Sequence, residues 1–287
     1  MCALAEIRDC DAQFGTTTLD GLLANPVPIC GVMGDSQAAM FAHRCFDVGS
    51  AKATLGSGSS VLLNVGECIP GVQNGAVASL AWVRNGRATY ALEGIINCCA
   101  ASLTWLRDQL GVIVNIEDAE QIARTADGEQ TVYLVPAFSG MGAPYWRDEA
   151  RAAIVGLSPH SNRAHVVRAA LDAIAYQLRD VLEMMQSESA TPLRQLRCDG
   201  GATQIPLLMQ FTADVLGIEL RVANQPNYSA LGAAMMATTG LGWHTSPASI
   251  AALDFEETTY RPSANVDQAN VGYRGWQRAV RQVLNTA

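Results

Sequence analysis

One acidic residue stands where the chain could do acid–base chemistry. The segment GVMGDSQAAM places Asp35 after an apolar run that ends in a glycine, and before an alanine-rich stretch typical of a helix start. Open α/β sheets bind ligands at the carboxyl ends of their strands, where a carboxylate can take a proton from an attacking hydroxyl. A helix cap is the alternative, because helix N-termini favour negative charge. We interpret Asp35 as a candidate general base.

Two glycine-rich turns could hold an anion. TLGSGSS contains Gly56, Ser57 and Gly58 between two predicted strands, and DGGAT contains Gly200 and Gly201 between a predicted strand and a predicted helix. Glycines let backbone N–H groups approach an anion together, and a serine hydroxyl adds a donor. Either sequence alone is also typical of a tight turn that needs positive φ. Because each follows an apolar strand, the two together favour contacts to the phosphates and the nucleoside of a nucleotide.

The composition argues against several classes of protein. The chain has 287 residues, 49% of them hydrophobic, and a net charge of −8. No basic stripe suggests a nucleic-acid partner, no apolar stretch is long enough to span a membrane, and the N-terminus does not resemble a signal peptide. The eight cysteines form no CxxC pair and the four histidines no HExxH motif. We therefore expect a cytoplasmic protein with reduced thiols, no metal site of its own side chains, and histidines on surfaces or in satisfied core positions.

The order of hydrophobic patterns predicts an α/β fold with a mixed sheet. Strands are expected at 27–32, 50–55, 60–65, 76–83, 88–92, 131–135, 193–198 and 218–222, and helices at 35–45, 95–110, 117–125, 163–187, 204–216, 229–240 and 268–285. Residues 1–26 are interpreted as a connection and 136–160 as a loop, while 27–32 is expected to be buried. Early hairpins followed by alternating strands and helices predict helices on both faces of the sheet.

Seven segments, in order, resemble the C-terminal half of FGGY-family carbohydrate kinases, with a pattern nearest that of glycerol kinases. They are GVMGDSQAAMFAH, AKATLGSGSSVLLNVGE, YALEGIINCCAASLTWLRDQL, VYLVPAFSGMGAPYWRDEARAAIVGLS, IAYQLRDVLEMM, RCDGGATQIPLLMQFTADVLG and SALGAAMMA. The resemblance implies an RNase H-like domain of the actin-like ATPase fold. It also implies a kinase that uses ATP and Mg²⁺ to phosphorylate a hydroxyl of a small-molecule polyol or sugar. Residues 27–287 would be the C-terminal nucleotide-binding domain, and 1–26 would connect it to a missing N-terminal half.

The resemblance also assigns roles to the residues that match family motifs. Asp35 corresponds to the catalytic base, Gly56, Ser57 and Gly58 to the turn that holds the ATP phosphates, and Gly200 and Gly201 to the turn at the adenosine. Glycerol kinases also associate as dimers or tetramers, so a homo-oligomer is among the expected states.

Five positions depart from the glycerol kinase pattern. Ala100 and Thr104 stand where those enzymes carry Gly and Gln near the nucleotide, and Ile205 stands where they carry Asn at the adenine. Ser36 replaces a Gln, and Ser60 replaces a Phe that packs on the glycerol carbons. The first three changes alter the adenine contacts. The two serines leave a roomier, more polar pocket, which favours a bulkier polyol or a ketose over glycerol.

A serine hydrolase is a rival interpretation of the same segment. GDSQA resembles the G-x-S-x-G nucleophile elbow, with Ser36 as nucleophile, and Asp199 or Asp214 and then His244 follow in the chain order of that fold. No oxyanion-hole segment precedes Ser36, and only one predicted strand lies upstream, which argues against a hydrolase. A third interpretation is a non-catalytic nucleotide-binding remnant.

The family's first phosphate loop does not occur in this chain. That loop is an apolar strand followed by Asp-x-Gly-Thr, and the nearest segment, Phe14–Thr17, lacks both the acid and the strand. Without it, one wall of the phosphate site and the acceptor's shelter from water would be absent. We therefore expect the chain alone to fold, to bind ATP weakly, to be inactive, and to self-associate through its exposed apolar surface.

Overall fold

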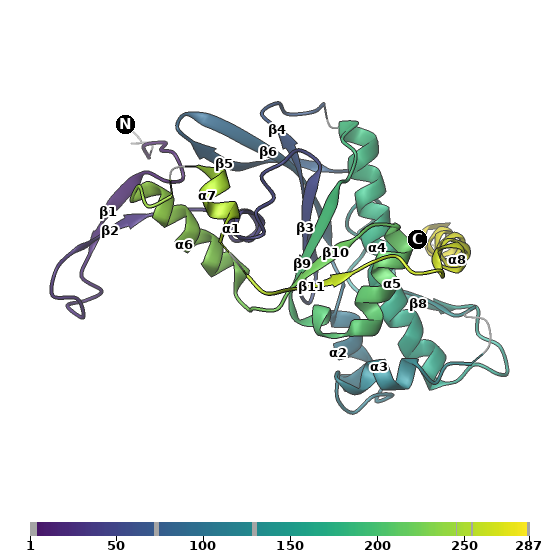
Figure 1. Cartoon of the computed structure of the whole chain (residues 1–287). Coiled ribbons are helices and arrows are strands. Elements are labelled where there is room, and N and C mark those ends of the chain that lie inside the picture. Colours follow the sequence, from purple (N-terminus) through teal and green to yellow (C-terminus); the bar gives the residue numbers. More distant parts are fainter. Residues whose placement is uncertain (1–4, 72–74, 128–130, 245, 254, 286–287) are drawn as a thin grey trace.

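A seven-stranded mixed sheet forms the centre of the molecule (Figure 1). The computed structural model describes residues 5–71, 75–127, 131–244, 246–253 and 255–285. In sheet order the strands are β11 (Glu257–Tyr260), β10 (Leu220–Ala223), β9 (Gln195–Asp199), β3 (Ser50–Leu55), β4 (Ser59–Gly66), β6 (Arg87–Ile96) and β5 (Val77–Arg84). Strands β10, β9 and β3 run parallel, and the remaining pairs are antiparallel. The predicted mixed sheet is confirmed.

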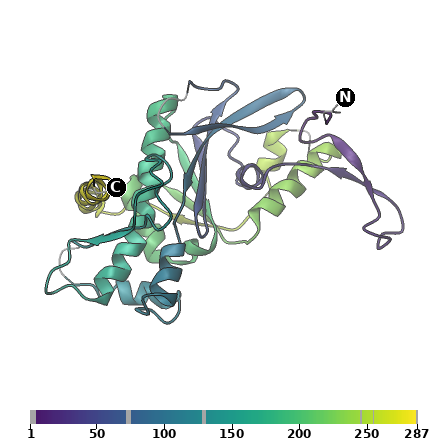
Figure 2. The same ribbon diagram turned by 180° about the vertical axis from the view of Figure 1, so that it is seen from behind.

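Helices cover both faces of this sheet, as predicted (Figures 1 and 2). One face carries α2 (Ala101–Asp108), α3 (Asp118–Ala123), α4 (Arg163–Ser189), α5 (Pro206–Leu216) and α8 (Val266–Asn285), and the other carries α1 (Asp35–Ala42), α6 (Tyr228–Gly240) and α7 (Pro247–Ala251). Successive strand residues alternate between the two cores: Val61 and Leu63 face the first, and Leu62 faces the second. We call these the α4 face and the α1 face.

Local sequence explains the limits of the long helices. Asn162 caps α4 by accepting from the backbone N–H of Ala164 at 2.8 Å, and Ala190 ends it in the left-handed region. Pro206 begins α5 at a position where no intrahelical N–H bond is required, and Gly217 ends it with φ 67°. The predicted helices at 163–187 and 204–216 therefore form with small shifts, because a short 3₁₀ turn, η1 (Gly201–Gln204), precedes α5.

The N-terminal region differs from the prediction. Residues Val27–Cys30 form β2, which pairs antiparallel with β1 (Gln13–Thr17), and this two-stranded ribbon projects from the body of the molecule (Figure 1). Most of β2 is exposed, so the expectation of a buried strand at 27–32 was wrong. An apolar run shows that a segment could be buried, but the elements available to cover it decide whether it is. Residues 1–4 lie outside the described part of the chain.

Several element boundaries also differ. Strand β6 continues to Ile96, so the helix expected at 95–110 begins at Ala101. Inside the predicted loop at 136–160, β8 (Ala153–Val155) pairs with β7 (Tyr133–Val135). Strand β11 and helix α7 were not predicted. The sequence of β11, ETTY, has no apolar alternation because an edge strand needs little burial.

The described cysteines behave as free thiols. Four of the seven, at positions 45, 98, 99 and 198, are buried, and none of the seven is in a disulfide. Burial raises the pKa of Cys45 and of Cys99 to about 12, so these thiols stay protonated. Cys2 lies outside the described residues. No described helix is long and apolar enough to cross a membrane.

Candidate functional site

The two glycine turns lie side by side at one edge of the sheet. Strands β3 and β9 are parallel neighbours in which Thr54 pairs with Asp199, so the turns that follow them leave the sheet together. A Cβ on Gly200, whose φ is 100°, would approach the Leu55 carbonyl oxygen to 2.5 Å. Only glycine fits this close crossing of two backbones. About 145 residues separate the turns along the chain, and the parallel pairing brings them together.

The first turn is fixed by the start of α2. The Gly56 carbonyl accepts from Ala100 N at 3.0 Å, and the Ser57 carbonyl accepts from Cys99 N at 2.8 Å and from Ala101 N at 3.1 Å. These bonds hold the turn in place and put Ala100 beside it. Gly58 packs on the end of β6, because a Cβ there would lie 2.7 Å from the Ile96 carbonyl oxygen.

The three residues predicted near the nucleotide, Ala100, Thr104 and Ile205, have different surroundings. Ala100 and Thr104 lie at the start of α2 and are half-buried. Ile205 is the residue before α5, and its buried side chain belongs to the core of the α4 face. Ala100 packs against the same core. Ile205 can therefore offer a nucleobase only apolar contact.

Asp35 is the first residue of α1 and is exposed. The N-cap position belongs to Gly34, so the interpretation of Asp35 as the cap residue itself was wrong. Its Oδ1 accepts from the backbone N–H of Ser36 at 2.8 Å, within the first helical turn, where negative charge is favoured. The carboxylate is thus held at a helix end, with access to solvent and ligands.

Ser36 and Ser60 line one hollow, which we call the Ser36 hollow. Its volume is about 530 Å³, and it is lined by Ser36, Gly58, Ser60, Glu93, Asn97 and Ser139, among others. The structure therefore brings two of the three predicted substrate residues, Ser36 and Ser60, to the same place as one residue of the first glycine turn. The third, Asp35, is not among the residues that line this hollow. A second hollow of about 500 Å³, the Asp199 hollow, is lined by Thr54, Asp199, Gly200, Gly201, Asn224 and Tyr228, among others.

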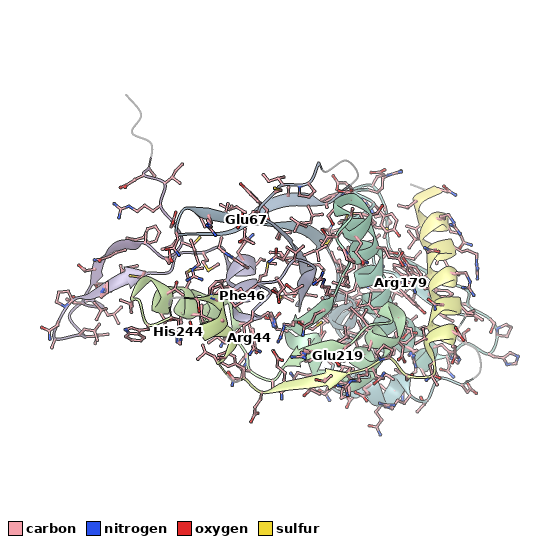
Figure 3. The ribbon with its side chains drawn as sticks, turned by 45° about the horizontal axis from the view of Figure 1, so that its top comes forward. Arg44, Phe46, Glu67, Arg179, Glu219 and His244 are labelled. Carbon is pink, nitrogen blue, oxygen red and sulfur yellow. The ribbon has the colours of Figure 1, made fainter. Side chains whose placement is uncertain are left out.

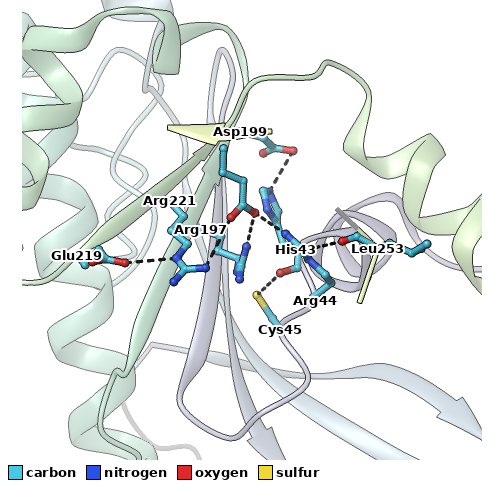
Figure 4. Close-up of polar contacts among 9 residues, drawn as sticks. His43, Arg44, Cys45, Arg197, Asp199, Glu219, Arg221 and Leu253 are labelled. Carbon is cyan, nitrogen blue, oxygen red and sulfur yellow. Dashed lines mark hydrogen bonds and ion pairs between the residues drawn. The ribbon is translucent and has the colours of Figure 1, made fainter. Parts of the chain in front are cut away.

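A buried polar cluster on the α1 face includes His43 and Asp199 (Figure 4), and Asp199 also lines the second hollow. His43, directly after α1, is 1% exposed, stacks on Tyr228 with ring centroids 4.3 Å apart, and places Nε2 3.6 Å from Asp199 Oδ2. Neither ring nitrogen has a hydrogen-bond partner among the described residues, so the expectation of a satisfied core histidine was wrong. Burial lowers the pKa of His43, although Asp199 opposes this shift. The ring is therefore neutral.

Lys52 occupies the centre of this region and was missed by sequence reasoning. Its side chain is 0% exposed and its Nζ donates to Thr54 Oγ1 at 3.1 Å. Burial lowers the pKa of Lys52, and the carboxylates of Asp199, Glu93 and Asp35 oppose that shift. The only sequence signal was a lysine at an inward position of SAKATL, where alternation predicts burial.

The charge of Asp199 is also set by these neighbours. Burial would raise the pKa of Asp199, but His43, Thr54 and Lys52 outweigh it and hold the pKa below the usual value. Asp199 is therefore ionised at neutral pH. Its Oδ1 is buried and accepts no hydrogen bond from the described residues.

A second ionic group anchors the end of α1 to the sheet (Figure 4). Glu257 Oε1 on β11 accepts from Arg44 at 2.7 Å and also from Arg197 on β9. The Arg44 guanidinium in addition donates to the Leu253 carbonyl at 2.8 Å. Because α1 begins with Asp35 and ends beside His43 and Arg44, these contacts fix the helix that presents the candidate base.

The residues of the rival hydrolase interpretation do not assemble. Asp214 lies in α5 on the α4 face and accepts from Ser263 N at 2.7 Å and Ser263 Oγ at 3.0 Å. Asp199 contacts His43, which lies at the opposite end of α1 from Ser36. His244 follows α6, at the outer end of that helix (Figure 3). This geometry excludes a triad built on Ser36 from these residues.

Comparison with known proteins identifies the family. Residues 51–241 match the model of the C-terminal domain of the FGGY family of carbohydrate kinases. The chain is 41% identical over 284 residues to the glycerol kinase of Desulfitobacterium hafniense and 42% identical over 283 residues to that of Halorhodospira halophila. These alignments cover 99% and 98% of this chain but only 58% and 55% of the relatives, so the chain spans a little over half their length.

Solved structures share the fold. The crystal structure of Plasmodium falciparum glycerol kinase with ADP matches with a TM-score of 0.86 at 31% identity, over 96% of this chain and 55% of that one. The xylulose kinase from Rhodospirillum rubrum matches with a TM-score of 0.82 at 21% identity, over 97% of this chain and 57% of that one. With the actin-like ATPase fold that these structures share and a family match over most of its length, the chain belongs to the FGGY family of carbohydrate kinases.

Proposed function

We propose that this chain is the nucleotide-binding part of an ATP-dependent kinase that phosphorylates a hydroxyl of a polyol or sugar. The observation that carries the proposal is one juxtaposition: Ser36, which follows Asp35, and Gly58 of the first glycine turn line the same hollow. A base at one side of a hollow and a phosphate-holding turn at the other is the arrangement that phosphoryl transfer to a hydroxyl needs.

In the proposed reaction the acceptor hydroxyl lies in the Ser36 hollow. Asp35 accepts its proton as the hydroxyl oxygen bonds to the γ-phosphorus of ATP and the bond to the β-phosphate oxygen breaks, which releases ADP. Gly56, Ser57 and Gly58 would hold the phosphates. Gly200 and Gly201 would contact the adenosine, with Ala100, Thr104 and Ile205 beside it.

The residues present fit a Mg²⁺ ion that arrives with the nucleotide. Within the described ranges, no three acidic, histidine or cysteine side chains form a metal-binding group. Mg²⁺ commonly binds through substrate phosphates, waters and one or two carboxylates rather than through a cage of protein ligands. When bound, the ion would neutralise phosphate charge. The part of this chain is to hold the phosphates and to accept the hydroxyl proton.

Because the chain covers little more than half of its relatives, we further propose that an N-terminal half supplies the first phosphate loop and the other wall of the acceptor site. Residues 1–26 would lead from that half, 27–287 would form the C-terminal domain, and the assembled protein would be cytoplasmic. A nucleotide-binding protein without catalysis is the second candidate, because the glycine turns contribute to the lining of the two hollows whereas Asp35 lines neither of them.

Asp35→Asn tests the catalytic proposal in the enzyme assembled with an N-terminal half from a relative. We expect turnover to fall by about 10²–10⁴-fold, the usual effect of losing a general base, while ATP affinity stays within about twofold. Ser158→Ala, a change in an exposed loop, is the control. A variant that keeps wild-type turnover would reduce Asp35 to a charge at a helix end.

A coupled assay on the 287-residue chain alone tests whether an N-terminal half is required. We expect weak ATP binding and no turnover of glycerol, longer polyols or ketoses. Turnover above roughly 1 s⁻¹, common for enzymes, would show that no other half is required. Sedimentation of the same sample would show whether exposed apolar side chains, such as Leu22 and Trp243, lead to a homo-oligomer.

A further inference from the structure

The floor of the Ser36 hollow contains a carboxylate that the proposed reaction does not use. Strands β4 and β6 are antiparallel neighbours in which Leu62 pairs with Glu93 and Ser60 pairs with Ile95. Leu62 belongs to the core of the α1 face, so these cross-strand partners project to the same side. Glu93 Oε1 accepts from Ser60 Oγ at 3.1 Å. The half-buried Glu93 side chain thus lies next to Ser60, the serine that stands where glycerol kinases carry phenylalanine.

The hydrogen-bonding capacity of this carboxylate is largely unused. An ionised carboxylate has about four acceptor positions. The bond from Ser60 is the one that Glu93 receives from the described side chains and backbone. Buried polar groups normally find partners, so a half-buried carboxylate with unused acceptor positions at a hollow indicates a polar ligand.

The other residues that line the Ser36 hollow are complementary to a polyol. Ser36, Asn97 and Ser139 offer further donors and acceptors, and the aliphatic side chain of Ile95 forms an apolar wall. The volume of about 530 Å³ lies in the range of small-molecule sites, about 300–1,000 Å³. A polyol offers both apolar C–H groups and hydroxyls, so it fits this combination.

Glu93 lines the hollow itself, and Asp35 is the residue before Ser36, which also lines it. Asp35 comes from the start of α1, whereas Glu93 comes from the middle of β6. Both carboxylates oppose the lowering of the pKa of the buried Lys52 side chain. A ligand that gives one hydroxyl to Asp35 could therefore give another to Glu93, provided that its carbon chain is long enough.

We propose that Glu93 is a specificity-determining residue. Its carboxylate would accept a hydrogen bond from a hydroxyl of the polyol other than the hydroxyl that is phosphorylated. The hollow would thereby select polyols longer than glycerol. This inference rests on the kinase function proposed above and narrows its substrate class. A phenylalanine at position 60 would fill the space in front of Glu93, and the smaller serine leaves its carboxylate accessible.

Amide NMR titrations of the chain assembled with an N-terminal half from a relative, which would complete the acceptor site, test this assignment. Glycerol and xylitol, which have the same hydroxyl chemistry and different lengths, are titrated separately while the amides of Gly58, Ser60 and Asn97 are followed. We expect wild type to bind xylitol several times more tightly than glycerol. Glu93→Gln should weaken xylitol binding by about tenfold, the effect of losing a hydrogen bond to a charged group, and glycerol binding by less than about twofold. Ser60→Phe should abolish the preference for xylitol.

Glu67→Gln is the matched control, because Glu67 is exposed and follows the opposite end of β4 (Figure 3). It should change neither affinity, and the amide spectrum of each variant reports its folding. Equal affinities for the two polyols, an unchanged Glu93→Gln variant, or no polyol-dependent shifts at the three amides would each overturn the assignment. ATP is titrated in parallel at Gly200 and Gly201. Polyol binding without ATP binding would contradict the kinase proposal alone, and the reverse would contradict the role of Glu93 alone.

Discussion

Two buried carboxylates on opposite faces of the same sheet differ in how they are satisfied. Asp180 on the α4 face is 6% exposed and accepts from Tyr145 Oη at 2.9 Å, Tyr273 Oη at 2.6 Å and Trp276 Nε1 at 2.7 Å. Asp199 on the α1 face is 8% exposed, lies 3.6 Å from His43, and has one oxygen without a partner. The burial is the same, but the first group is saturated and the second is open.

The difference distinguishes a carboxylate that stabilises the fold from one that a ligand can contact. Asp180 joins α4, α8 and the loop around Tyr145, and it lies in a core without contact to the glycine turns. Asp199 directly precedes Gly200 and lines a hollow. A buried polar group whose partners all come from the fold stabilises the fold, whereas one with an unused atom beside a cleft is available to a ligand.

The largest expected effect comes from the saturated group. Trp276→Ala should lower the free energy of unfolding by about 3–5 kcal/mol, because it opens a cavity and removes a donor from Asp180. Trp276 is 0% exposed, whereas Trp243 is 72% exposed, so Trp243→Ala should cost less than about 0.5 kcal/mol. Urea unfolding measures both. A loss below about 2 kcal/mol for Trp276→Ala would show that the Asp180 cluster is not a structural anchor.

The two carboxylates should respond to pH with opposite signs. Burial raises the pKa of Asp180 to about 6, against the effect of its three donors, so the folded state holds this proton more tightly than the unfolded state does. Its contribution to stability should therefore fall as pH rises from about 4 to about 6, by up to about 3 kcal/mol, and then stay constant. The difference between wild type and Asp180→Asn, measured by urea unfolding across this range, isolates the effect.

Asp199→Asn provides the opposite case. Because the pKa of Asp199 is lowered in the folded protein, its stabilising contribution is present above the ordinary aspartate pKa and is lost as pH falls below it. Its difference from wild type should be constant between about pH 5 and 7 and shrink in more acidic solution. Slopes of the same sign for the two variants would contradict the distinction between the groups.

A pair of tyrosines tests the same distinction at the level of one hydroxyl. The Tyr273 hydroxyl donates to Asp180 and its oxygen lies 3.1 Å from Glu183 Oε2. Tyr273→Phe should therefore lower the free energy of unfolding by about 2 kcal/mol. The hydroxyl of Tyr228 is buried without a partner among the described residues, so Tyr228→Phe should be neutral or slightly stabilising. Thermal and urea unfolding measure the two. Equal losses would show that Tyr228 has a structural partner of its own.

The smallest effect in free energy concerns the nucleotide. Asp199→Asn should weaken ATP binding by about tenfold, or about 1.4 kcal/mol, because the residue before Gly200 and Gly201 loses the charge through which it interacts with His43 and Lys52. Asp180→Asn should leave ATP affinity unchanged. Calorimetric titration of both variants makes the comparison, and an equal loss in Asp180→Asn would attribute the effect to general destabilisation.

Local sequence was sufficient to predict most of the helices and strands. The three- and four-residue apolar period of α4, the caps and the strand alternation predicted most helices and strands, because these signals act between residues close in the chain. Local sequence also proposed the glycine turns and Asp35 as site candidates, because glycine allows backbone conformations that other residues avoid and because ligands bind at the carboxyl ends of strands. The order of family motifs then predicted the fold class.

The tertiary structure decided which polar residues meet. Lys52, Asp199 and His43 come from separate segments, and they form a cluster only because β3 pairs in parallel with β9 while α1 covers the same face. Glu93 became a candidate only when β6 placed it beside Ser60. The exposure of β2 likewise depended on what lay next to it. Pattern and turn chemistry are local and can be read from sequence, whereas burial, charge and hydrogen-bond saturation depend on neighbours that only long-range pairing supplies.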